Sequence, residues 1–251
     1  MSDRPPEGTR IGVVGGGPAV AERVAAGGGD PVAGDAETIV DAAPVAVVAV
    51  GERALADLVA AGVEVPVLPV AAPDGVRPVP ESAVESAVAS VLAGEFDRVE
   101  RPLLSTSGPG ASDGRSRALF DLALVTAEPA RISEYTVLTG GRRVATFRAD
   151  GVVVATPVGS TGYARAAEGP VLASGTGVVA VVPVSPFATD ADRWVLPADG
   201  VGLLVERDET PVRLIADGRD AGAVPPRRPL DVSTRGVLTV AVVDASARSL
   251  G

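Results

Sequence analysis

The stretch DGVVVATPVGSTGY, residues 150–163, carries the most information about this chain. Its first part, Val152–Ala155, is a short apolar run, which is typical of a buried β-strand. The residues that follow are rich in proline, glycine and hydroxyl side chains, which predicts a tight turn. Gly159 and Gly162 carry no β-carbon, so a ligand can approach the backbone closely. Tyr163 adds a flat ring with a polar tip, suited to stacking on a base or a nicotinamide, although a turn without a ligand is the alternative interpretation.

This stretch resembles the NAD-binding segment of the NAD kinase family, usually written DG-(apolar)-STPTGSTAYSLSAGGP. The two align without a gap from Asp150 to Pro170. Further downstream, Val182–Pro186, Arg193–Pro197 and Asp217–Arg219 resemble three other family elements in the right order. The resemblance covers about residues 116–243 and is weak before them. It implies an α/β domain followed by a β-sandwich domain, with the active site between them.

Composition limits the possible partners. The chain has 251 residues with 22 basic and 32 acidic side chains, which gives a net charge of −10, and every basic residue is arginine. We expect a protein from a salt-rich cytoplasm, of an acidic, halophile-like type, that does not bind nucleic acid, because such binding needs a basic face. No apolar run approaches the length of a membrane helix. Met1–Pro6 lacks the apolar core of a signal peptide, so the sequence predicts a soluble, cytoplasmic protein.

Missing residue types exclude several kinds of chemistry. The chain has no cysteine and no histidine, which excludes thiolate metal sites, thiol nucleophiles and Ser-His-Asp triads. Without lysine, a Walker A phosphate loop and a Schiff base are also excluded. Any catalytic base is therefore expected to be Asp, Glu or Tyr. Any metal is expected to be a hard, oxygen-bound ion, by default Mg²⁺, and no metal-ligating residue of the protein is assigned.

Strand–helix alternation predicts a Rossmann-like α/β domain over residues 1–100, with a parallel sheet covered by helices. The expected strands are Arg10–Val14, Val45–Val50 and Val65–Val70, and a helix is expected from about Ala19. The turn Gly15–Gly17 supplies only two of the three glycines of a dinucleotide fingerprint, which favours a structural turn.

Local signals predict details of this domain. Gly62 is expected to end a helix as its C-cap. Pro66 and Pro69 suit an edge strand or a strand end better than a central strand. Ser82–Glu85 has the pattern of a capping box at the start of a further helix.

Residues 101–251 are expected to form an all-β, sandwich-like, NAD-binding domain. Turn signals recur along it, and Glu134–Thr139 and Arg142–Phe147 flank Gly140–Gly141, which predicts a β-hairpin. Trp194 is expected to belong to the core of this domain. Asp217–Arg219 is interpreted mainly as a turn, with a functional site as the alternative.

The resemblance assigns substrate-binding roles in the second domain. Asp150, Thr161, Gly162 and Tyr163 match the retained centre of the NAD-binding segment. Asp121 matches the acidic member of a family Asn-Glu or Asn-Asp pair that holds the adenosine ribose, but the asparagine position holds a phenylalanine. Gly162 stands where the family has alanine.

The family's Gly-Gly-Asp-Gly-Thr motif falls on Val50–Ala54. The resemblance implies that Glu52, at the aspartate position, is the catalytic base for the ribose 2′-hydroxyl. It also implies that Gly51 and Arg53 bind phosphate, Arg53 through a side chain that is always charged. Val50 and Arg53 replace glycines, and their side chains can equally block phosphate. A solvated helix start is the alternative interpretation of Glu52 and Arg53.

Two functions remain open at this point. The first is an NAD kinase that phosphorylates the 2′-hydroxyl of NAD to NADP, using ATP or polyphosphate with Mg²⁺. The second is a non-catalytic NAD(P)-binding or regulatory relative of NAD kinase. A small-molecule nucleotide is the expected partner in both, and a homo-oligomer is expected by analogy with the family.

Overall fold

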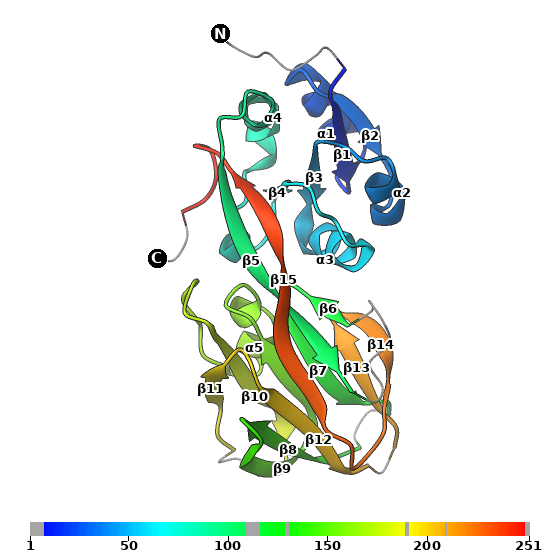
Figure 1. The fold of residues 1–251 in the computed structure, drawn as a ribbon, viewed down its shortest axis with the longest axis vertical. Coiled ribbons are helices and arrows are strands. Elements are labelled where there is room, and N and C mark those ends of the chain that lie inside the picture. The colour runs from blue at the N-terminus through cyan, green and yellow to red at the C-terminus, as the bar shows by residue number, and fades with distance from the viewer. Residues whose placement is uncertain (1–7, 109–115, 129–130, 189–190, 209, 249–251) are drawn as a thin grey trace. The chain divides into compact units, whose positions relative to one another are not determined.

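The computed structural model describes residues 8–108, 116–128, 131–188, 191–208 and 210–248. The chain forms two compact units, one of Met1–Arg101 with Val237–Gly251 and one of Pro102–Gly236 (Figure 1). The chain passes from one unit to the other within β5 (Asp97–Ser107) and β15 (Leu230–Val242). The end of the chain, grouped with the second domain from its sequence, thus packs in the first unit, where Val240 of β15 pairs in parallel with Val67.

The first unit is an α/β fold with a parallel sheet in the strand order β2-β1-β3-β4-β15. Strands and α-helices alternate, as the sequence predicts, and the structure adds a strand at Asp30–Ala33 and a helix at Ala36–Asp41 to the predicted elements. The elements are β1 (Arg10–Val14), α1 (Gly17–Ala26), β2 (Asp30–Ala33), α2 (Ala36–Asp41), β3 (Ala46–Val50), α3 (Gly51–Ala61), β4 (Val67–Val70) and α4 (Val84–Leu92), with 3₁₀ turns at Asp74–Val76 and Glu81–Ala83.

Helices cover both faces of this sheet. Helices α1 and α4 contact each other, and α2 and α3 form a second contacting pair (Figure 1). Successive strand residues point to opposite faces. Accordingly, Ile11 and Val13 pack with the buried side chains of α1 and α4, whereas Gly12 lies against Ile39 of α2. Strands buried on both faces explain the continuous apolar runs in the sequence.

Three local signals have different outcomes in the structure. Gly62 ends α3 as its C-cap at φ 80°, as predicted. The capping box is wrong, because the 3₁₀ turn at Glu81–Ala83 contains Ser82 and places Ala83 at the N-cap of α4. An edge position for the third strand is wrong, because β4 pairs with both β3 and β15, whereas the strand-end alternative holds for Pro66, which directly precedes Val67. Both prolines contribute carbonyl oxygens: Pro66 accepts from the Val47 amide at 3.0 Å, and Pro69 accepts from the Val79 amide at 2.9 Å.

The second unit is rich in β-structure, with neighbouring strands in the order β14-β13-β7-β9-β8-β12-β15, while β10 joins β9 and β11. Its strands are β6 (Arg117–Ala118), β7 (Asp121–Thr126), β8 (Ser133–Thr139), β9 (Arg142–Ala155), β10 (Val178–Pro186), β11 (Trp194–Pro197), β12 (Val201–Arg207), β13 (Val212–Ala216) and β14 (Arg219–Val224). It also contains one 3₁₀ turn and a short helix, α5 (Tyr163–Ala166), in its described part.

The long strand β9 organises the second unit. Its first half pairs with β8 in the predicted hairpin, where Thr139 lies opposite Arg142 across the glycine pair. Its second half lies between β7 and β10, so that the Ala155 end is bordered by strands on both sides. Alternate residues of this half face two clusters: Val152 and Val154 join the main core, and Val153 and Ala155 pack with Ala164 of α5.

Membrane-spanning helices were sought in the described ranges, and none of the helices there has the necessary length and apolar character. The prediction about Met1–Pro6 lies outside the described residues.

Candidate functional site

The predicted turn after β9 is a compact loop, here called the signature loop, residues 156–163. Strand β9 ends at Ala155, as expected, and a 3₁₀ turn at Gly159–Thr161 leads through Gly162 into α5. Thr156, Val158, Gly159 and Ser160 are buried, whereas Thr161, Gly162 and Tyr163 are exposed. The loop thus has an anchored half and a half that is open to a ligand.

The anchored half is bonded to the segment Leu119–Asp121, which leads into β7. The hydroxyl of Thr156 donates to the carbonyl oxygen of Leu119 at 2.7 Å and lies 3.2 Å from that of Phe120. The Thr156 amide donates to the Phe120 carbonyl at 2.9 Å, and the Gly159 amide donates back to the Thr156 hydroxyl at 3.1 Å. Thr156 therefore fixes the loop to the start of β7.

Ser160 is also part of the anchor. Its side chain is buried, its hydroxyl donates to the Pro157 carbonyl at 2.8 Å, and it accepts from the Leu172 amide at 3.0 Å. The hydroxyl is thus committed within the loop. Of the two hydroxyl side chains at the centre of the loop, only that of Thr161 is exposed to a ligand.

Both predicted carboxylates of the second unit act electrostatically on Tyr163. Partial burial raises the pKa of the Tyr163 phenol, and the nearby negative charges of Asp121 and Asp150 raise this pKa further. The phenol is therefore a neutral hydrogen-bond donor at physiological pH, near two acceptors. Its side chain remains 44% exposed, which leaves a ring face for stacking.

Asp121 and Asp150 come from neighbouring strands. Asp121 is buried at the start of β7, with its backbone paired to Ala155. Asp150 lies in β9, where its carbonyl oxygen accepts from the Thr126 hydroxyl at 3.2 Å and from the Tyr135 hydroxyl at 3.4 Å. These contacts fix the backbone from which the Asp150 carboxylate projects.

The predicted residues of the first unit lie at the start of α3. Gly51 opens the helix at φ 80°, and a β-carbon there would meet no described atom within 4 Å. Glu52 is an exposed residue of the first helical turn. The side chain of Arg53 is 72% exposed, and its Nε donates to Asp57 one turn later at 2.9 Å. These three residues lie together, but in a different compact unit from the other five.

The glycines of the first unit form a tight turn between β1 and α1. Gly15, Gly16 and Gly17 all have positive φ angles, and Gly16 is the N-cap of α1. A β-carbon at Gly16 would lie 2.8 Å from the Val50 side chain, which leaves no room for one.

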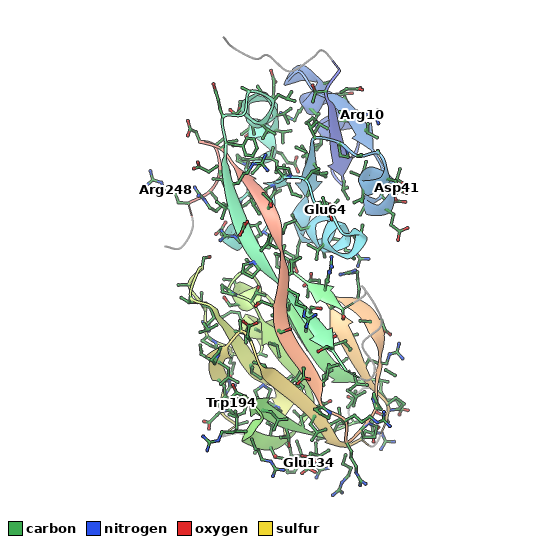
Figure 2. All side chains as sticks on the ribbon, in the orientation of Figure 1. Arg10, Asp41, Glu64, Glu134, Trp194 and Arg248 are labelled. Carbon is green, nitrogen blue, oxygen red and sulfur yellow. The ribbon has the colours of Figure 1, made fainter. Side chains whose placement is uncertain are left out.

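Trp194, labelled in Figure 2, lies at the edge of the main core of the second unit, as expected. Its ring stacks on that of Phe147, with ring centroids 5.7 Å apart. Both rings line a cavity of about 450 Å³ on the β8–β9 hairpin, together with Glu134. The described lining of this cavity includes none of the predicted site residues.

Protein ligands for a metal are sparse. Among the residues that the structure describes, no three His, Cys, Asp or Glu side chains are grouped so that they could hold a metal ion.

Asp217 makes more contacts than its turn pattern predicts. Asp217 forms the predicted turn between β13 and β14, with Gly218 at φ 74°. Its carboxylate also accepts hydrogen bonds from the Leu119, Phe120 and Asp121 amides. The Asp-Gly pair signals the turn, but no local pattern signals partners about a hundred positions away.

Comparisons with known proteins show which sequences and structures resemble this chain. Residues 120–241 match the model of the ATP-NAD kinase C-terminal domain family. The chain is 36% identical to an NAD kinase of Methanosarcina mazei over 142 residues, which is 57% of this chain and 45% of that protein. It is 39% identical to the Methanosarcina barkeri NAD kinase over 104 residues, or 41% of this chain and 35% of that protein. The chain thus spans about half or less of the length of these two relatives.

Solved structures extend the similarity to the whole fold. The crystal structure of an Archaeoglobus fulgidus NAD kinase in complex with ATP superposes with a TM-score of 0.77 at 19% identity, covering 94% of each chain. Yeast NADH kinase complexed with NADH gives a TM-score of 0.76 at 15% identity, covering 95% of this chain and 84% of that chain. Residues 120–241 are thus similar to the C-terminal domain of ATP-NAD kinases, in a chain that has the fold of NAD kinases.

Proposed function

We propose that this chain binds NAD or NADP at the signature loop and, as an NAD kinase, phosphorylates the 2′-hydroxyl of NAD. The observation that supports the binding step is the arrangement around Tyr163. Thr161, Gly162 and Tyr163 form the exposed half of the loop, and the charges of Asp121 and Asp150 act on the phenol.

The chemistry of this arrangement suits a dinucleotide. Ribose hydroxyls and a carboxamide are donors that the carboxylates of Asp121 and Asp150 can accept. The exposed Thr161 hydroxyl and the Gly162 backbone add polar contacts, and the Tyr163 ring provides a stacking surface. Solved relatives with this fold were crystallised with ATP and with NADH, which supports a nucleotide ligand.

For the transfer step we propose Glu52 as the base. The 2′-oxygen of NAD would form a bond to the terminal phosphorus of ATP or polyphosphate, and its proton would pass to the Glu52 carboxylate. The bond from that phosphorus to its bridging oxygen would break, releasing ADP or a shortened polyphosphate. Gly51 offers an open backbone for the donor phosphates, and Arg53 offers a guanidinium. Mg²⁺ would enter with the donor and neutralise its charge.

A specific observation favours the second candidate, a non-catalytic NAD(P)-binding relative. Arg53 is held by Asp57 on its own helix, and the side chains of Val50 and Ala54 are apolar where the family motif has glycine and threonine. In this case the binding half of the proposal holds and turnover is absent.

One experiment separates the two candidates. Purified protein is incubated in high salt with NAD, Mg²⁺ and either ATP or polyphosphate, and NADP is measured enzymatically. NAD binding is measured on the same preparation by calorimetry. NADP production supports the kinase; binding without production by either donor supports the non-catalytic relative; absence of both overturns the proposal.

A further inference from the structure

The carboxylate of Asp217 is bonded to three consecutive backbone amides. Its Oδ2 accepts from Leu119 at 2.7 Å, and its Oδ1 accepts from Phe120 at 2.8 Å and from Asp121 at 3.0 Å. The Asp217 amide in turn donates to the Asp121 carbonyl at 3.0 Å. An ionised carboxylate suits this position, because it has two acceptor oxygens and no donor.

The opposite side of the same segment is bonded to the signature loop. The carbonyl oxygens of Leu119 and Phe120 accept from Thr156. Gly159 packs so closely on Phe120 that a β-carbon would overlap the Phe120 carbonyl group. Segment 119–121 is thus held by Asp217 through its amides and by the loop through its carbonyls.

This segment determines where a site residue lies. Asp121 is its last member, and the Asp121 carboxylate is one of the two charges that act on Tyr163. A shift of the segment would therefore move Asp121 and the loop relative to each other. Displacement of a binding group by about 1 Å is enough to weaken a site substantially.

We propose that Asp217 is a positioning residue of the dinucleotide site: its carboxylate holds segment 119–121 so that Asp121 and the signature loop face the ligand together. The assignment of a ligand rests on the proposed function, whereas the positioning of the segment does not. The Asp217 carboxylate accepts its three hydrogen bonds from backbone amides of the protein, so it acts on the site through the segment.

Burial of the Asp217 carboxylate costs free energy, which supports a dedicated role for this residue. Burial raises the pKa of the Asp217 carboxyl, and the three amide hydrogen bonds and the charge of Arg219 oppose this rise. A turn between two strands needs only a residue that tolerates the left-handed conformation, and an asparagine meets that need. Its amide group, however, would present a donor to at least one of the three donor amides.

The test compares Asp217→Asn with Asp220→Asn in the full-length protein. Asp220 lies in the same hairpin, is exposed, and pairs with Arg213 at 2.6 Å, so it controls for the loss of a charge. Three quantities are measured: the NAD dissociation constant by calorimetry, hydrogen exchange of peptides that cover residues 117–126 and 156–163, and the midpoint of urea unfolding.

Asp217→Asn is expected to raise the NAD dissociation constant about tenfold or more and to speed exchange in those two peptides above that of the rest of the second unit. Asp220→Asn is expected to change the dissociation constant by less than about twofold. Unchanged affinity and unchanged local exchange in Asp217→Asn overturn the proposal. Exchange that rises uniformly through the second unit, in step with the unfolding midpoint, also overturns it, because it shows a general loss of stability.

Asp217→Glu keeps the charge and serves if the asparagine variant fails to fold. The longer side chain displaces the carboxylate, and we expect weaker NAD binding with faster local exchange. Wild-type affinity in this variant overturns the proposal. If the wild-type protein binds no NAD, the proposed function fails, and the exchange of residues 117–126 in the variants still decides whether Asp217 positions the segment.

Discussion

Gly159 lies directly against the backbone of Phe120. A β-carbon at Gly159 would overlap the Phe120 carbonyl group and would lie 2.8 Å from its Cα. Because the obstacle is backbone and not a flexible side chain, Gly159→Ala is expected to destabilise the protein by about 3 kcal/mol or more. Urea unfolding measures this change.

Gly162→Ala is the matched control for that substitution. Its β-carbon would have its nearest neighbour, the Gly159 carbonyl oxygen, at an ordinary 3.4 Å. We expect a loss of less than about 1 kcal/mol. If both variants unfold at the same urea concentration, the close packing of the loop on Phe120 is contradicted.

Asp150→Ala is expected to weaken NAD binding by about 1–3 kcal/mol, because the ligand would lose the acceptor that this half-buried carboxylate provides. Asp231→Ala removes an exposed carboxylate of the same unit and is expected to leave binding unchanged. Calorimetry on both variants measures the difference. Equal affinity of the two variants would remove Asp150 from the site.

The chain has only two tyrosines, and the pKa values of both phenols are shifted in the same direction. Burial raises the pKa of Tyr135 and of Tyr163 above the usual 10.0, and nearby aspartates raise both further. The folded protein therefore still binds phenolic protons at a pH near 10, where the unfolded chain releases them. The stability that these two groups contribute is present below that pH and is lost as the pH rises through their folded pKa values. Absorbance of tyrosinate against pH, before and after Tyr163→Phe, measures each group. Titration of either phenol at its usual pKa in the folded protein contradicts its environment in the structure.

If the protein is a kinase, Glu52→Gln is expected to reduce NADP formation by about a hundredfold or more, because the amide keeps the shape but cannot accept the proton. NAD affinity is expected to remain within about twofold of wild type, since the amide preserves the local shape. Turnover and calorimetry on one preparation measure both quantities. Turnover equal to that of the wild type removes Glu52 from the chemical step.

The elements predicted from the sequence are those with strong local patterns. Val45–Val50 and the glycine pair after Thr139 give a strand and a hairpin because apolar periodicity and turn chemistry act within a few residues. The short β2 and α2 were missed: β2 is four residues with a proline, and α2 is six residues, below the length at which periodicity is clear. The N-cap at Asp35, which accepts from the Thr38 amide at 2.8 Å, was the available signal.

The predictions from the sequence are wrong or incomplete where tertiary contacts determine the structure. Pro69 lies in the central strand β4 and Pro66 directly precedes it, because their carbonyl oxygens remain available for hydrogen bonds, which composition does not reveal. Within the site, Thr161–Tyr163 are exposed in the turn that the sequence predicts. The hydrogen bonds from Asp217 to residues 119–121 join parts of the chain that no local pattern connects.

Calorimetric titration of the wild-type protein with NAD and NADP in high salt tests the central claim most directly. The geometry around Tyr163 predicts a saturable heat of binding with at least one of the two, together with a rise in the thermal unfolding midpoint. No heat and no thermal shift with either dinucleotide, even at high ligand concentration, would contradict a dinucleotide site at the signature loop.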